Sequence, residues 1–192
     1  VSYYYKKNQY TTTELFYPAN TEIPVDALVK DIEQIIVPAS GLNFLYYLDR
    51  CGFKDNTEIV FYDNNLHSLK MMKMIIEEFD GTDYLWFVRN NCTGVFADDK
   101  SIQQHWDSVK HLWQLSKRVK YRYEHCDIMY DLPPNVKQNG IIHLTNIFTY
   151  EPNAGFSSLS HRVWSRNLLF KDLHLNYKDV NIITTSYPEQ GF

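Results

Sequence analysis

The chain has 192 residues, 44% hydrophobic and 22% charged, which is the composition of one folded globular domain rather than of a disordered protein. Its formal net charge of -4 supplies no basic field, so we expect no nucleic-acid partner. No run approaches the ~20 consecutive apolar residues that a membrane-spanning helix needs, and the first residues lack the layout of a signal peptide. We therefore expect no membrane association, and a cytoplasmic protein or a part of a viral particle.

The cysteines and histidines show no metal-binding pattern. Cys51, Cys92 and Cys126 are odd in number and lack C-x-x-C spacing, which is poor material for a disulfide framework or a structural zinc site. Only His105 and His111 lie close together, and a separation of six residues puts them on different faces of one helix. We expect a reducing compartment and no metal site.

Residues 1–32 differ from the rest of the chain. They are polar and aromatic, they are interrupted by Pro18 and Pro24, and they show no sustained helical period. We interpret them as an N-terminal extension, with a short strand, that packs across a single domain formed by residues 33–192.

The domain begins with a strand–helix–strand–helix pattern. The apolar run EQIIVPAS at 33–40 is typical of a strand covered on both faces, and residues 41–51 follow as a buried helix that Gly52 stops. A second strand, TEIVFYDN, occupies 57–64. Residues 66–81 then place apolar side chains at helical spacing, namely Leu69, Met72, Ile76 and Phe79.

The remaining sequence continues the alternation. We predict helices at 83–90, 98–118 and 157–176, and strands at 119–128, 140–148 and 179–187. The strand at 119–128 alternates enough to favour an edge position. Parallel neighbours need crossover connections, so the pattern predicts an α/β fold: a three-layer α/β/α, doubly wound, mainly parallel and Rossmann-like sheet.

In such a sheet, ligands bind beyond the carboxyl ends of the strands, where the winding direction reverses. Ser40, Gly41 and Asn43 follow the first strand, and Asp63 and Asn64 end the second. A glycine lets a ligand approach the backbone, and the N–H groups at the start of a helix favour an anionic group. A carboxylate at the second strand can accept hydrogen bonds from two vicinal ribose hydroxyls.

Over residues 33–187 the sequence resembles the class I S-adenosylmethionine-dependent methyltransferases. The resemblance implies S-adenosylmethionine as cofactor, held by three groups of residues: the methionine part by Ser40, Gly41 and Asn43, the ribose by Asp63 with Asn64, and the adenine by Cys126, Asp127 and Ile128. It also implies that the loop LTNIFTY, with Thr145, Asn146 and Tyr150, holds an unidentified methyl acceptor. In that reading Asn146 and Tyr150 are the catalytic positions.

A base is needed only for a hydroxyl or ammonium acceptor. His143, Glu151 and His161 are the candidates, and the sequence does not choose among them. Alignment of the acceptor with the methyl group would be the main contribution of the protein, worth about 7 kcal/mol or more.

Other interpretations stay open. The family's loop carries an acid and two or three glycines, whereas VPASGLNF holds only Gly41, and no N/D-P-P-Y acceptor motif is present. The chain could be a non-catalytic Rossmann-like module of a larger assembly, with a protein partner or a second copy. It could also be an enzyme that binds another nucleotide, because Asp63 suits any ribose. Individually, Gly41 could start a helix, Asp63 could cap one and Asp127 could lie in a turn.

Overall fold

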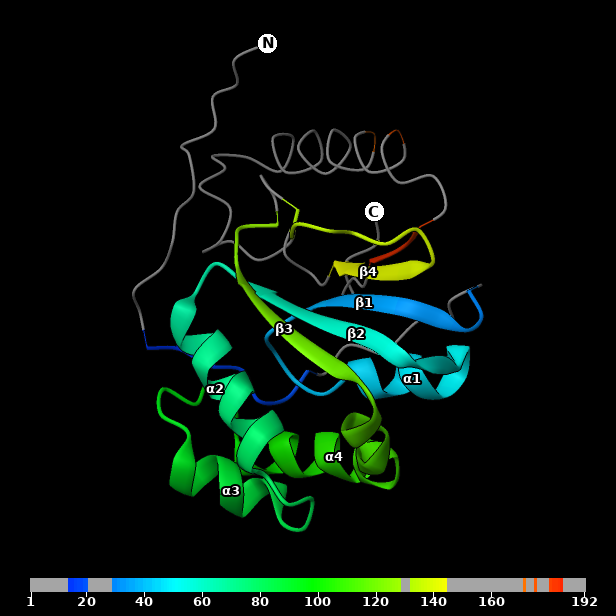
Figure 1. Ribbon diagram of the computed structural model, residues 1–192. Helices are drawn as coiled ribbons and strands as arrows, with labels where there is room; N and C mark the ends of the chain where they lie inside the picture. Colours follow the sequence, from blue (N-terminus) through cyan, green and yellow to red (C-terminus); the bar gives the residue numbers. More distant parts are fainter. Residues whose placement is uncertain are drawn as a thin grey trace, which may run out of the picture.

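The computed structural model describes residues 14–20, 29–128, 132–144, 171, 175 and 180–184. Within these ranges the chain forms a five-stranded sheet in the order β3-β2-β1-β4-β5 (Figure 1). The strands are β1 (Ile32–Pro38), β2 (Phe53–Asp63), β3 (Lys120–His125), β4 (Gly140–Leu144) and β5 (Asn181–Thr184). All four neighbouring pairs are parallel, so the predicted α/β fold with a parallel sheet is confirmed.

The chain reverses its winding direction beside the central strand. From β1 it proceeds outward through β2 to β3 at one edge, and it then returns to the other side of β1 with β4. Ile36 of β1 accordingly pairs with Val60 on one side and with Ile142 on the other. The edge position predicted for β3 is confirmed, and the reversal lies at the carboxyl ends of β1 and β4.

The described helices lie together on one side of the sheet (Figure 1). They are α1 (Phe44–Cys51), α2 (Leu66–Glu78), α3 (Tyr84–Asn91), α4 (Asp99–Val109) and the 3-10 helix η1 (Lys110–Arg118). The helical character predicted for residues 98–118 is confirmed, but the segment divides into α4 and η1 instead of forming one continuous helix. At Val109, the last residue of α4, φ is -119° and ψ is -9°, far from the ideal α-helical values of about -63° and -42°, and the chain continues with the tighter 3-10 geometry.

Local side chains explain where three of the helices begin. Asn65 starts α2 by accepting a hydrogen bond from the N–H of His67, and Asp83 and Asp98 do the same for α3 and α4. Gly52 ends α1 with a φ of 69°, a left-handed conformation that favours glycine.

Both faces of the central strands are buried, because successive side chains of a strand point to opposite faces. On the helical side the core contains Ile35, Val37, Ile59, Phe61 and Ile141. On the other side it contains Ile36, Val60, Tyr62, Ile142 and Leu144, packed with Ile128 and Val180. This pattern accounts for the continuous apolar runs of the two strands that the sequence predicted.

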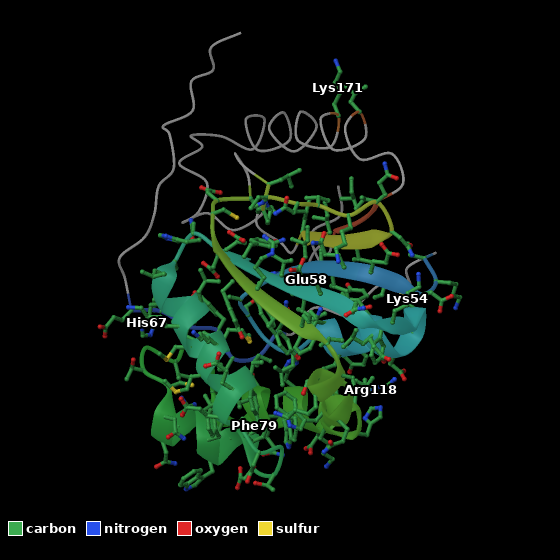
Figure 2. The ribbon with its side chains drawn as sticks, viewed as in Figure 1. Lys54, Glu58, His67, Phe79, Arg118 and Lys171 are labelled. Atoms are coloured by element: carbon green, nitrogen blue, oxygen red, sulfur yellow. The ribbon has the colours of Figure 1, made fainter. Side chains whose placement is uncertain are left out.

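The helical layer has an aromatic centre around Phe79, which Figure 2 shows among the helices. Its ring centroid lies 5.1–5.4 Å from those of four other aromatic residues, Tyr84, Phe87, Trp106 and Trp113. Such pairs add about 0.5–1.5 kcal/mol each beyond the area they bury. The apolar stripe predicted from Ile102 to Trp113 therefore faces the core.

One described part of the N-terminal extension, Glu14–Asn20, packs on the helical layer, and the other, residues 29–32, leads into β1. Phe16 is fully buried and forms an isolated parallel bridge with Val95. Its N–H donates to the carbonyl of Gly94 and its carbonyl accepts from the N–H of Phe96, both at 2.8 Å. The predicted short strand is thus reduced to one bridge here. The domain boundary at residue 32 remains a prediction.

Candidate functional site

The carboxyl ends of three neighbouring strands meet at one rim of the sheet. The N–H of Ala39 donates to the carbonyl of Tyr62 at 2.9 Å, which aligns the ends of β1 and β2. The N–H of Cys126 donates to the carbonyl of Asp63 at 3.0 Å, which aligns the ends of β2 and β3. The predicted adjacency of β1 and β2 is confirmed, and Ser40, Asp63 and Asp127 follow strands that end side by side.

Asp63 lies at the centre of this rim, and most of its surface is buried. Its Oδ1 accepts a hydrogen bond of 2.8 Å from the N–H of Asn65, so the carboxylate shapes the turn into α2, whereas the helix cap itself is Asn65. Burial raises the pKa of Asp63 from 3.8 to about 7, the N–H of Asn65 opposes this rise, and the negative charge of Asp127 adds to it. Asp63 therefore titrates near neutrality.

The residues after β3 complete the acidic side of the rim. Asp127 and Ile128 are buried, Cys126 is partly exposed, and His125 is exposed with its Nε2 3.1 Å from the carbonyl of Asn64. The structure thus brings the carboxyl groups of Asp63 and Asp127 close enough to interact electrostatically. The assignment of Asp63, Asn64 and Asp127 to a ribose and a base remains a prediction.

The loop between β1 and α1 is packed against the N-terminal extension. Gly41 has a φ of 62°, and its N–H donates to the carbonyl of Tyr17 at 3.0 Å. A Cβ on Gly41 would lie 2.7 Å from the backbone nitrogen of Asn20, so glycine is required by both conformation and space. The N–H of the next residue, Leu42, donates to Nε2 of His105 at 2.8 Å.

His105 is the site residue that the sequence analysis missed. It lies on α4, it is buried, and burial lowers its pKa from 6.5 to about 4, so the ring is neutral and Nε2 can accept the hydrogen bond. A signal was available, because His105 falls three residues after Ile102 and four before Val109, on the buried face of the helix.

The predicted methionine-binding residues are largely covered. Ser40 is partly exposed, whereas Ala39, Gly41, Leu42 and Asn43 are buried. The assignment of Ser40, Gly41 and Asn43 to a cofactor remains a prediction, but the N–H groups of Gly41 and Leu42 already have partners within the chain.

The acceptor loop cannot be placed, because Thr145, Asn146, Tyr150, Glu151 and His161 lie outside the described residues. His143 lies on β4, is fully buried and packs its ring 5.5 Å from that of Tyr47. Burial lowers the pKa of His143 to about 4. A base at this position would have no direct access to an acceptor in solvent.

The described residues contain neither a metal-binding cluster nor a membrane-spanning helix. No group of three or more His, Cys, Asp or Glu side chains in this part of the chain is placed to hold a metal ion. Among its helices, none has the length and apolar character needed to cross a membrane.

No family model, curated protein or solved structure matches this chain. The fold and the rim define an α/β protein with a parallel sheet and two acidic residues, Asp63 and Asp127, where β2 and the edge strand β3 end.

Proposed function

We propose that this protein is a methyltransferase-like enzyme that binds S-adenosylmethionine at the rim formed by Asp63 and Asp127. The proposal includes a doubly wound, three-layer Rossmann-like architecture, with a second helical layer on the face formed by Ile36, Val60 and Ile142. Its support is the strand order β3-β2-β1-β4-β5, which reverses direction beside β1 as nucleotide-binding sheets do.

The observation that carries the proposal is the position of Asp63. It ends the strand next to the point of reversal, and the N–H of Asn65 holds its Oδ1, which orients the carboxylate. An ionised carboxylate so placed accepts hydrogen bonds from the two hydroxyls of a ribose, and such charge-assisted bonds are about twice as strong as neutral ones.

The residues present fit the nucleoside end of the cofactor better than its amino-acid end. Asp63 and Asn64 would hold the ribose, and Asp127 with Ile128 would border the base. When bound, S-adenosylmethionine would supply an activated methyl group, and the role of the protein would be to orient the acceptor toward it.

Isothermal titration calorimetry with S-adenosylmethionine and S-adenosylhomocysteine tests this function. We expect binding to the wild type, and a loss of about tenfold or more in Asp63→Asn, which keeps the shape and removes the charge. Because the pKa of Asp63 is about 7, the affinity should increase as the pH rises through 7. The matched control is Asp49→Asn, an exposed acid on α1.

A second candidate is a non-catalytic Rossmann-like module of a larger assembly. The loop after β1 favours this candidate, because the N–H groups of Gly41 and Leu42 donate to Tyr17 and His105 and are not available to a cofactor. If neither ligand binds or stabilises the wild type at millimolar concentration, the module becomes the better description.

A further inference from the structure

Two backbone donors in the loop just before α1, the N–H groups of Gly41 and Leu42, are already in use. An anionic group binds at the start of a helix by accepting hydrogen bonds from free N–H groups. Here the N–H of Gly41 donates to Tyr17 at 3.0 Å and the N–H of Leu42 donates to His105 at 2.8 Å. A carboxylate or phosphate that used these two N–H groups would have to displace both partners.

The segment Glu14–Asn20, which we term the N-terminal strap, is anchored on both sides of Tyr17. Before it, the carbonyl of Leu15 accepts hydrogen bonds of 3.1 Å from the side chains of Asn65 and Ser68, and the Phe16 side chain is fully buried. After it, the hydroxyl of Tyr84 donates to the carbonyl of Pro18 at 2.9 Å. Releasing Tyr17 would therefore expose apolar surface and break several hydrogen bonds.

His105 holds the same loop from the helical layer. Its Nε2 accepts from Leu42, its ring bonds the backbone of Asn20, and a Cβ on Gly41 would lie 3.1 Å from the same nitrogen. The imidazole thus links the strap to the loop after β1. The hydrogen bonds of Tyr17 and His105 to this loop therefore stabilise each other.

The other described residues of the rim are also unsuited to binding an anionic ligand group. Asp63 and Asp127 carry the acidic groups, and the described rim residues, at 39–43, 63–66 and 125–128, include no Lys or Arg. Phosphates in proteins are bound by Arg, Lys or free N–H groups.

From these observations we infer that the described part of the rim recognises the neutral nucleoside end of its ligand and offers no subsite for a carboxylate or a phosphate. The inference rests on the proposed function and narrows its ligand class. Neutral or cationic nucleosides would bind, and nucleoside diphosphates would not.

Calorimetry on the full chain with adenosine, 5′-methylthioadenosine, S-adenosylhomocysteine and ADP tests the inference. We expect the first three to bind within about threefold of one another, and ADP to bind at least about tenfold more weakly. Binding of S-adenosylhomocysteine or ADP more than about tenfold tighter than that of 5′-methylthioadenosine would overturn the inference and leave the proposed function standing. Absence of binding by all four would overturn both.

A second measurement needs no ligand. Amide hydrogen exchange followed by NMR should show Gly41 and Leu42 protected by about a hundredfold or more, because both donors are bonded and buried. Exchange at the rate of an open loop would contradict the inference.

The variant His105→Ala removes the partner of one donor. We expect faster exchange at Leu42 and a gain of S-adenosylhomocysteine affinity relative to 5′-methylthioadenosine. The matched control His111→Ala, an exposed histidine on η1, should change neither. Unaltered exchange at Leu42 in a folded His105→Ala protein would show that the contact does not protect the donor.

Discussion

Gly81 lies directly against the indole ring of Trp113: a Cβ built on Gly81 would come within 2.3 Å of Cδ1 and 2.7 Å of Nε1. The φ of Gly81 is +93°, which L side chains rarely adopt. Two independent reasons therefore require glycine at this position, just after α2.

Gly81→Ala should lower the free energy of unfolding by about 2–4 kcal/mol, because overpacking adds to backbone strain. Urea denaturation measures the change. Gly52→Ala is the matched control, since Gly52 also has a positive φ of 69° but a Cβ there would meet only Asp31 Oδ1 at 3.6 Å. It should cost about 1 kcal/mol. Equal losses in the two variants would show that the contact with Trp113 is unimportant.

Asp63 should make the stability depend on pH in an unusual direction. The carboxyl has a pKa of about 7 in the folded protein and near 3.8 as a reference, so the folded state binds the extra proton between these values. The contribution of Asp63 to the free energy of unfolding therefore falls as the pH rises from about 4 to 7, by at most about 1.4 kcal/mol per pH unit. Above pH 7 this contribution no longer changes.

The contribution of Asp63 is isolated by comparing wild type with Asp63→Asn in urea titrations across this range. The difference between the two should grow in favour of Asn as the pH rises, whereas Asp49→Asn should run parallel to the wild type. A difference independent of pH would mean that Asp63 is ionised in the folded protein throughout.

His105 should make the stability depend on pH in the direction opposite to that of Asp63. Burial lowers its pKa from 6.5 to about 4, so the unfolded chain binds a proton that the folded protein does not between these values. This contribution to stability is complete above about 6.5 and is lost as the pH falls toward 4. Protonation would also end the acceptance of the Leu42 N–H by Nε2.

His105→Gln removes the titrating group and keeps an acceptor oxygen. We expect the variant to lose less stability than wild type between pH 6.5 and 4, with a remaining decline from His143, whose pKa is likewise lowered to about 4. Denaturation curves at several pH values provide the measurement. The same acid sensitivity in wild type and variant would refute the assignment, and His111→Gln serves as the exposed comparison.

Gln34 organises the polar part of the sheet face opposite the helices. It is 1% exposed; its Nε2 donates to Glu58 Oε2 at 2.7 Å and to the Asn135 carbonyl at 3.1 Å, and its Oε1 accepts from Lys137 N–H at 2.9 Å. Glu58, labelled on β2 in Figure 2, also bonds Arg122 at 3.2 Å. One amide therefore satisfies three groups that are remote in sequence.

Gln34→Met keeps the volume and leaves those three groups without this partner. We expect a loss of about 2–4 kcal/mol in the free energy of unfolding, measured by urea denaturation. Gln104→Met, on the exposed side of α4, should change it by less than about 0.5 kcal/mol. A Gln34 variant as stable as this control would mean that the groups find other partners.

Much of the fold could be predicted because the signals are local. The apolar runs around Ile36 and Val60 identify buried strands, and the spacing of Leu69, Met72 and Ile76 identifies a helix, since these periods follow from backbone geometry. The break at Val109 gave no such signal, because the residues on both sides keep helical spacing. The prediction of Asp63 at the rim succeeded for the same local reason: it is the last residue of a recognisable strand.

The sequence alone determined that β1, β2, α1 and α2 form and that β1 and β2 pair in parallel, because each depends on a period within a few residues and on the length of the connection. Only the tertiary structure decided that Tyr17 and His105 accept hydrogen bonds from the loop after β1, and that Gln34 forms hydrogen bonds with Asn135 and Lys137. These partners are separated by 24 to more than 100 residues, and hydrogen bonds across such distances depend on how whole elements pack, which no local pattern records.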